Sequence, residues 1–189
     1  MAKIAVVYHS TYGHTAAVAR SVAEGAARVE GAEVDLVNVA EISEKWDLLH
    51  GADAIIFGCP TYMGSGSADF KKFMEATSHY WAEQRWQDKL AAGFTNSGSQ
   101  NGDKLNTLVQ LAIFAAQHGM IWVSLGLLPG NNASSASIND LNRLGSFMGA
   151  MAQSNIDQGA DSVPPANDHE TAARLGQRVA ELAGRFKKP

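Results

Sequence analysis

The first fifteen residues place a buried strand, a polar loop and the start of a helix directly after one another. Ile4-Ala5-Val6-Val7 is apolar on both strand faces, which is typical of a central strand covered by helices on each side. A loop rich in hydroxyl groups follows, and a helical pattern begins near Thr15. At such a junction, loop hydroxyls and free backbone N–H groups can face an anion, and the helix dipole adds partial positive charge. This segment therefore predicts the first strand–helix unit of an α/β fold, with an anion site in its loop.

The composition of this loop indicates a single terminal phosphate as the anion. Ser10, Thr11 and Thr15 supply hydroxyl groups, and Gly13 supplies a permissive backbone. No lysine follows in a Gly-Lys-Ser/Thr arrangement, which argues against a nucleoside triphosphate with magnesium. No Gly-x-Gly-x-x-Gly is present, which argues against a dinucleotide pyrophosphate. An ordinary strand-to-helix turn capped by threonine is the alternative interpretation of this segment.

Composition restricts the class of protein. The 189 residues are 46% hydrophobic, which suits one domain (residues 1–189) with a sizeable core. The net charge of −4 and the lack of a basic block argue against nucleic acid as a partner. No apolar run approaches the length needed to cross a bilayer, and the N-terminus shows no signal segment. The lone cysteine, Cys59, is compatible with a reducing compartment. We therefore expect a cytoplasmic protein that does not insert into membranes.

Five apolar runs alternate with helical patterns and predict an α/β fold with a doubly wound parallel sheet. The runs cover residues 4–8, 34–39, 54–58, 90–95 and 121–125. With right-handed crossovers, the expected strand order is 2-1-3-4-5, with helices on both faces. The second run is more polar than the others, so it is expected nearer an edge of the sheet.

The helical patterns also have expected boundaries and buried faces. Helices are expected from residue 15, over 43–49, around 70–74, over 103–118 and from residue 167. Ser43 is expected to cap the second of these, and Asn167 with Glu170 forms a capping box for the last. Leu105 and Phe186 are expected on the inward faces of the last two helices.

Residues 126–145 do not read as a continuous element. A loop of this length in a compact domain is usually functional or mobile. Residues 147–153 are compatible with a further strand, and 155–167 read as a loop.

Three polar loops leave the carboxyl ends of the first, third and fourth strands. They cover residues 10–15, 59–67 and 96–102. Because the carboxyl ends of parallel strands lie at one edge of a sheet, these loops are expected around the crevice between the first and third strands. They carry hydroxyls, amides and glycines with almost no charge. A neutral, hydrogen-bonding wall with a phosphate clamp at one end suits a flat heteroaromatic mononucleotide.

The run Ser10-Thr11-Tyr12-Gly13-His14-Thr15 resembles the phosphate loop of the flavodoxin-like proteins. More narrowly, it is similar to that of the WrbA-type NAD(P)H:quinone oxidoreductases. The similarity extends through residues 54–61, 73–81 and 118–120. This resemblance implies a flavodoxin-like fold, FMN as the cofactor, and NAD(P)H and quinone-like molecules as partners.

The resemblance also implies roles for individual residues. The FMN phosphate would be held by Ser10, Thr11, Tyr12, Gly13, His14 and Thr15. One side of the isoalloxazine ring would be lined by Pro60, Thr61, Tyr62, Met63 and Gly64. The third loop, whose residues 97–102 would meet the pyrimidine edge, contributes Asn96, Ser97, Gly98, Ser99, Gln100, Asn101 and Gly102. His118 matches a catalytic histidine that approaches the flavin, Trp81 an aromatic residue of the substrate pocket, and Tyr12 a residue near the nicotinamide.

Several of these residues have structural interpretations as well. His118 precedes a helix-terminating glycine and could instead cap the helix C-terminus. His14 could be an ordinary polar residue at a helix start. Trp122 lies in an apolar run and is expected in the core, whereas Trp86 is open to either interpretation. Cys59 is expected to be a small buried residue rather than a nucleophile, and no metal-ligand spacing is present.

Three functions remain open at this point. The first is an enzyme that transfers a hydride from NAD(P)H to FMN and two electrons on to a quinone or similar acceptor, working as a homodimer or homotetramer. The second is a flavodoxin-type electron carrier, although a net charge of −4 is mild for a protein that docks through an acidic face. The third is an FMN-binding regulatory protein without turnover.

Overall fold

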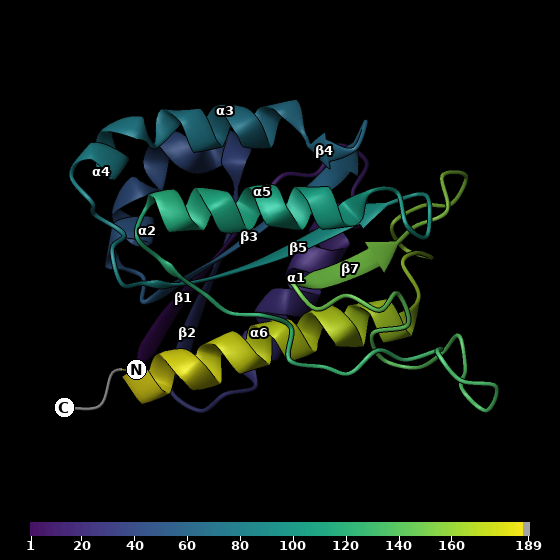
Figure 1. Cartoon of the computed structure of the whole chain (residues 1–189). Coiled ribbons are helices and arrows are strands. Elements are labelled where there is room, and N and C mark those ends of the chain that lie inside the picture. The colour runs from purple at the N-terminus through teal and green to yellow at the C-terminus, as the bar shows by residue number, and fades with distance from the viewer. Residues whose placement is uncertain (187–189) are drawn as a thin grey trace.

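A twisted parallel sheet forms the centre of the computed structural model, which describes residues 1–186 (Figure 1). Its main strands are β1 (Ala2–Tyr8), β2 (Ala32–Asn38), β3 (Ala54–Tyr62), β5 (Leu90–Ser97) and β6 (Ile121–Trp122). They are hydrogen-bonded in the order β2-β1-β3-β5-β6. This order confirms the predicted 2-1-3-4-5 arrangement, including the edge position of the second strand. The strand order reverses between β1 and β3, where Val6 pairs with Ile56.

Helices cover both faces of the sheet. α1 (His14–Ala27) and α6 (Ala166–Phe186) cover one face. The other face carries η1 (Val39–Glu44), α2 (Trp46–Gly51), α3 (Ala68–Ala76), α4 (Ser78–Ala82) and α5 (Lys104–Gln117). Each face has its own hydrophobic core, the first beneath α1 and α6 and the second beneath the helices of the other face. Because side chains alternate along a strand, Ile4 and Val6 of β1 enter the first core, whereas Ala5 and Val7 enter the second.

The two helices of the first face pack backbone against backbone. A Cβ atom at Gly25 of α1 would lie 1.9 Å from the carbonyl oxygen of Ala173, and one at Gly176 of α6 would lie 1.9 Å from that of Val22. The absence of side chains at these two glycines permits the close approach.

The last position of the sheet is shared by two short strands, so the predicted strand 121–125 is too long. β6 pairs only with Leu90 and Ala91, at the start of β5. β7 (Ala150–Gln153) pairs with residues 94–97, at the end of β5. With β4 (Ser65–Gly66), which pairs antiparallel with β3, the described sheet has seven strands rather than five. The chain leaves the sheet after Trp122 and returns at residue 150.

The connection between β6 and β7 is ordered around one buried asparagine. The Asn142 side-chain amide donates to the carbonyl oxygens of Leu127, Leu128 and Ser146, and its Oδ1 accepts from the Ser146 N–H. The Asn142 N–H donates to Thr171 Oγ1 on α6 at 2.9 Å. These bonds fix residues 126–145 against α6, so this segment has a defined path without regular secondary structure.

Several local predictions were wrong. Ser43 lies inside η1, and Lys45 is the N-cap residue of α2. Asn167 lies inside α6, because the helical hydrogen bonds already begin at the Pro165 carbonyl, which accepts from the His169 N–H. The Asn167 side-chain amide donates to the carbonyl oxygens of residues 138 and 140 in the long connection. Leu105 and Phe186 are exposed. Helical periodicity assigned Leu105 to the core, but Lys104 and Thr107 of the same helix are buried in its place.

Across residues 1–186, no helix combines the length and the apolar character that a membrane span requires.

Candidate functional site

The loop between β1 and α1 has the geometry of an anion site. Gly13 adopts a left-handed backbone conformation (φ 89°) directly before α1, and its N–H donates to Ser10 Oγ at 3.1 Å. The Ala17 N–H, fourth in the helix, donates to the Gly13 carbonyl at 2.9 Å. The three earlier N–H groups of α1 therefore precede the first helical hydrogen bond and can serve a ligand. His14 and Thr15 line the cleft in front of this helix start, so an anion there would meet the helix dipole.

The three loops predicted to converge lie around one cleft of about 580 Å³. It opens at the carboxyl edge of the sheet, toward which the β7 arrow points in Figure 1. The three loops contribute Ser10, Tyr12, His14, Thr15, Pro60, Thr61, Tyr62, Asn96, Ser97 and Gly98. The cleft continues into a second hollow of about 490 Å³, to which Met63, Gly64, Ser99 and Gly102 are added. Together they form an elongated cavity with the helix start at one end.

A fourth loop, residues 154–160 after β7, closes the cleft and was missed from the sequence. Ser154 Oγ donates to Asn96 Oδ1 at 3.0 Å, which joins this loop to the third one. His14 Nε2 lies 2.8 Å from the carbonyl oxygen of Gln158 and must donate to it, since a carbonyl only accepts. His14 therefore joins the first loop, between β1 and α1, to the fourth loop. The fourth loop has no motif of its own, but its position after a strand beside β5 could have indicated it.

The hydroxyl group of Thr61 does not face the cleft. Thr95 Oγ1 donates to the Cys59 carbonyl at 2.7 Å, so it accepts from Thr61 Oγ1 at 2.8 Å. Thr61 Oγ1 in turn accepts from Thr107 Oγ1 at 2.8 Å. This directed chain of three buried hydroxyl groups links β3, β5 and α5. Thr61 can therefore serve a ligand only through its backbone, and its side chain has a structural role.

The third loop divides its residues between two sides. Ser97, Gly98, Ser99 and Gly102 line the cleft. Gln100 and Asn101 line a separate depression with Arg143 of the long connection. The structure therefore places these two predicted ligands of the cofactor away from the cleft.

Exposed side chains form the rim of the cleft. Tyr12 is 75% exposed, Tyr62 is 39% exposed, and Met63 is fully exposed. Met63 (φ 49°) and Gly64 (φ 79°) form a two-residue turn between β3 and β4, with Tyr62 paired to Ser65. Both turn residues have positive φ, the pattern of a tight hairpin turn, which is uncommon for methionine. Large apolar side chains at the rim of a polar cleft suit contact with a planar ligand.

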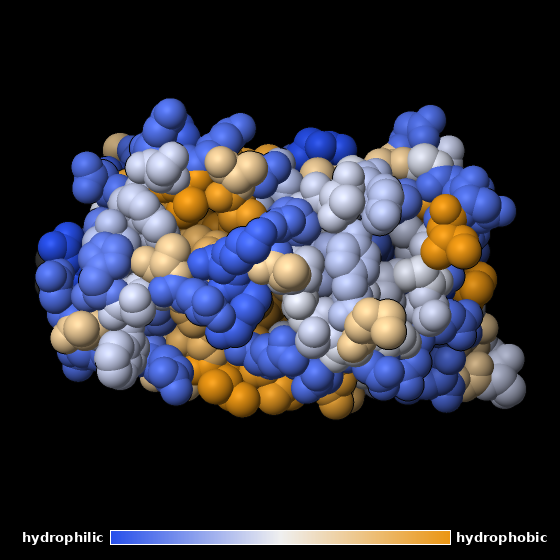
Figure 2. All heavy atoms as spheres, turned by 90° about the horizontal axis from the view of Figure 1, so that it is seen from above, coloured by the Kyte–Doolittle hydropathy of each residue, from blue (hydrophilic) through white to orange (hydrophobic). Residues whose placement is uncertain are grey.

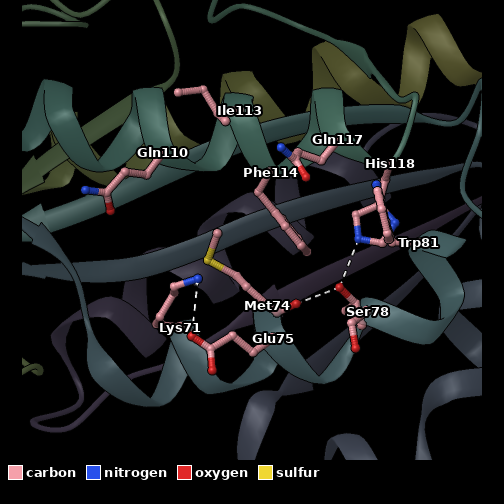
Figure 3. A pocket seen from close by; sticks show the side chains of 11 residues that line it. Lys71, Met74, Glu75, Ser78, Trp81, Gln110, Ile113, Phe114, Gln117 and His118 are labelled. Atoms are coloured by element: carbon pink, nitrogen blue, oxygen red, sulfur yellow. Dashed lines mark hydrogen bonds and ion pairs between the residues drawn. The ribbon is translucent and has the colours of Figure 1, made fainter.

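Trp81 and His118 lie in a different pocket, of about 630 Å³, between α3, α4 and α5 (Figure 3). The Thr77 hydroxyl donates to the Met74 carbonyl at 2.7 Å, so its oxygen accepts from His118 Nε2–H at 2.9 Å. Burial lowers the pKa of His118 to about 4, so the ring is neutral at pH 7. Among residues 1–186, its Nδ1 is buried without a hydrogen-bond partner. His118 follows the last residue of α5 as its C-cap, but a neutral ring cannot act there as a positive cap.

Trp81 and His118 lie at the end of this pocket that is far from the cleft of the same chain, whereas its other end reaches Gln110, which accepts from the Gly66 N–H beside Thr61. Lys104, the first residue of α5, contacts the third loop, whereas His118 follows the last. A helix of 14 residues is about 20 Å long at 1.5 Å per residue. Seen from above, the face that includes α3 shows apolar surface on both sides of a band of hydrophilic side chains (Figure 2). The two pockets have no lining residue in common.

The remaining singled-out side chains are structural. Trp86 is fully buried and donates its indole N–H to His50 Nδ1 at 3.1 Å. Trp122 is half-buried against the second core and donates to the Met148 carbonyl. Burial raises the pKa of the Cys59 thiol to about 12, so it is not a nucleophile. Within residues 1–186, no three His, Cys, Asp or Glu side chains gather as a metal site would require.

Comparison with known proteins connects this site to a family. Residues 2–134 match the family model described as NADPH-dependent FMN reductase. The chain is 48% identical to flavodoxin FldP of Pseudomonas aeruginosa, over 96% of this chain and 97% of that protein. It is 36% identical to an NAD(P)H dehydrogenase (quinone) of Archaeoglobus fulgidus, over 97% of this chain and 98% of that protein.

Solved structures agree with the architecture. A WrbA-like flavodoxin from Agrobacterium tumefaciens is 43% identical and superposes with a TM-score of 0.76, covering 99% of this chain and 100% of that one. A flavodoxin from the domain Archaea, 22% identical, superposes with a TM-score of 0.66 over 96% of this chain and 99% of that one. The fold is therefore flavodoxin-like, as the sequence predicted.

Proposed function

Because this chain belongs to the NADPH-dependent FMN reductase family, we propose that it is an FMN-dependent oxidoreductase that oxidises NAD(P)H and reduces a quinone or a similar acceptor. The observation that carries the proposal is the gathering of four almost uncharged loops around one helix start. Overall, NAD(P)H and one proton reduce the quinone to the quinol and leave NAD(P)⁺.

The residues of the cleft fit FMN. The helix start at Gly13–Thr15 would receive the terminal phosphate, and Ser10 and Thr15 would add hydroxyl donors. The elongated cavity beyond it, lined by Pro60, Tyr62 and the third loop, would receive the ring. When bound, FMN supplies the ring that accepts a hydride and returns two electrons, so the protein need not supply an acid or a base.

The protein's own contribution would be to hold and orient. The bond from His14 to the Gln158 carbonyl keeps the fourth loop over the phosphate end. Behind the cleft, the Thr61 hydroxyl chain ties the carboxyl ends of β3 and β5 to α5 and stabilises this part of the fold. Tyr12, exposed at the rim, is our candidate for contact with the nicotinamide.

The proposed roles of Trp81 and His118 carry a geometric condition. Since both residues lie at the C-terminal end of α5, far from the cleft of the same chain, they could act on a flavin only from a second copy. A homodimer or homotetramer that placed one copy's pocket over the other's cleft would satisfy this condition. Sedimentation velocity of wild type would test it, and a strictly monomeric active protein would remove both residues from the site.

A second candidate function rests on a specific relative. The 48% identical protein of Pseudomonas aeruginosa is named a flavodoxin, which makes a carrier of single electrons between proteins the alternative. The mild net charge of −4 favours the enzyme over a carrier that docks through a strongly acidic face.

Anaerobic reduction separates the two functions. The purified protein is loaded with FMN, its flavin absorbance is recorded, and NADH or NADPH is added without oxygen. Bleaching by a nicotinamide, followed by reoxidation with benzoquinone, is the expected result. Bound flavin that neither nucleotide reduces would refute the enzyme and leave the carrier. A protein that takes up no FMN would refute both.

A further inference from the structure

Lys104 is a charged side chain in the interior directly behind the third loop of the cleft. It is the first residue of α5 and is 0% exposed. Its Nζ donates to Ser97 Oγ at 2.8 Å and to the Ser99 carbonyl at 2.6 Å. Both partners are neutral oxygens, so neither cancels the charge. A buried charge held this way is costly, and its position beneath a ligand-lining loop points to a role there.

A buried ion pair lies close to Lys104. The Arg143 guanidinium donates from Nε and Nη2 to the two carboxylate oxygens of Asp168, each at 2.8 Å. Both side chains are almost completely buried. Arg143 comes from the connection between β6 and β7, and Asp168 from α6. With Lys104, the three charges leave one net positive charge behind the loop.

Lys104 carries its proton at neutral pH. Burial lowers its pKa to about 8, with Arg143 acting in the same direction and Asp168 against it. The side chain is therefore mainly protonated at pH 7. It would lose its proton within the mildly alkaline range unless a nearby negative charge held it.

The carbonyl groups of the third loop point toward this cluster. The Ser99 carbonyl accepts from Lys104, and the Gly98 carbonyl accepts from Gln153 Nε2 at 3.1 Å. Gln153 Oε1 in turn accepts from Arg143 at 3.2 Å. In a trans peptide, the C=O and the following N–H point in opposite directions. The N–H groups of Ser99 and Gln100, which follow these two carbonyls, therefore point away from the charged cluster.

We propose that Lys104, supported by the Arg143–Asp168 pair, is an electrostatic positioning residue that favours negative charge at the third-loop edge of bound FMN. It does so through its own charge and through the orientation of the loop amides. The inference rests on the proposed function, since it requires FMN in the cleft. Reduction adds negative charge to the flavin ring, and a nearby positive charge stabilises it. This arrangement favours an acceptor of hydride over a carrier that must hold electrons at low potential.

The test measures the two-electron midpoint potential of bound FMN, by equilibration with a reference dye, together with the Kd of oxidised FMN. In Lys104→Met, we expect the affinity for reduced FMN to fall about tenfold relative to oxidised FMN, as for two unit charges separated by one layer of loop backbone. A tenfold change in this ratio lowers a two-electron potential by about 30 mV.

Two further variants separate charge from structure. Lys89→Met is the control. It removes a partly buried lysine at the opposite end of β5, whose Nζ donates to the carbonyls of His50 and Ala52. Its potential should equal that of wild type. Asp168→Asn removes the negative member of the cluster and should raise the potential. A purely structural effect would shift the midpoint potential of Lys104→Met and that of Asp168→Asn in the same direction.

An unchanged potential in Lys104→Met, or shifts of the same sign in both cluster variants, would overturn the inference. If Lys104→Met is not recovered folded, the direction of the shift in Asp168→Asn decides. Failure of the proposed function is distinct, because wild type would then not bind FMN or not be reduced by NAD(P)H.

Discussion

Replacing Gly13 by alanine tests whether the left-handed turn before α1 forms the phosphate end of an FMN site. At φ 89°, a Cβ on this residue would also lie 3.2 Å from the Cβ of Ala160 in the fourth loop. The substitution therefore strains the backbone of the first loop and pushes the fourth loop outward. Both loops line the proposed phosphate site.

The expected loss of folding stability is the difference between two opposing effects. The left-handed conformation costs a residue with a Cβ roughly 1–2 kcal/mol. Reduced freedom of the unfolded chain returns about 0.4–1 kcal/mol. The net loss of about 1 kcal/mol should lower Tm by about 2–4 °C in a chain of this size. The Kd of FMN should rise at least tenfold, because the helix start no longer presents its N–H groups in the required geometry.

Gly31→Ala is the matched control. Gly31 also has a positive φ, of 78°, but a Cβ there would have no neighbour within 4 Å. It should therefore show a similar loss of Tm in differential scanning calorimetry, with an unchanged Kd in an FMN fluorescence titration. Normal FMN affinity in Gly13→Ala, or an equal loss in both variants, would refute the assignment of this loop.

Three other variants test contacts of Thr61, Trp81 and His118. Thr61→Val should lower the free energy of unfolding by about 1–3 kcal/mol, because it leaves the buried hydroxyls of Thr95 and Thr107 without their partner. FMN affinity should change little. Urea titration measures the first effect and an FMN titration the second, and a large loss of affinity would contradict the structural role of this hydroxyl. Trp81→Ala should slow benzoquinone reduction and spare FMN affinity, and an equal loss of both would contradict its proposed place in the substrate pocket. His118 has a pKa of about 4 in the folded state, below its unfolded value, so its contribution to stability is complete above pH 6.5 and is lost as pH falls toward 4. His118→Gln should therefore show a shallower decline of Tm between pH 6.5 and 4, and an identical decline would argue against a buried neutral ring.

Local patterns predicted the fold well wherever a single segment contained the whole signal. The apolar runs of β1, β3 and β5 are buried on both faces, so each predicted its strand directly. The two cap predictions failed because the helices begin at other residues: Ser43 lies within η1, and α6 begins at Ala166. The His169 N–H already donates to the Pro165 carbonyl, so Asn167 is inside the helix, and its amide N–H groups serve the long connection.

The divided edge strand shows the same limit on a larger scale. Residues 121–125 and 147–153 each resemble a strand, but β5 offers one free edge of eight residues. Each segment pairs with only part of that edge, and neither segment's pattern predicts which residues of β5 it will pair with.

Local patterns in the chain are sufficient to predict the parallel α/β architecture, the strand order and the convergence of three neutral loops, because the strands, the glycines and the hydroxyls of each loop are contiguous in the sequence. Packing between distant segments sets which of those loop residues face the cleft, and it directs the Thr61 hydroxyl and the Gln100 and Asn101 side chains away from it. It also brought in the fourth loop, the buried charge of Lys104 and the separate pocket of Trp81 and His118. Those features depend on contacts between segments far apart in the chain, and only packing sets the directions in which such side chains point.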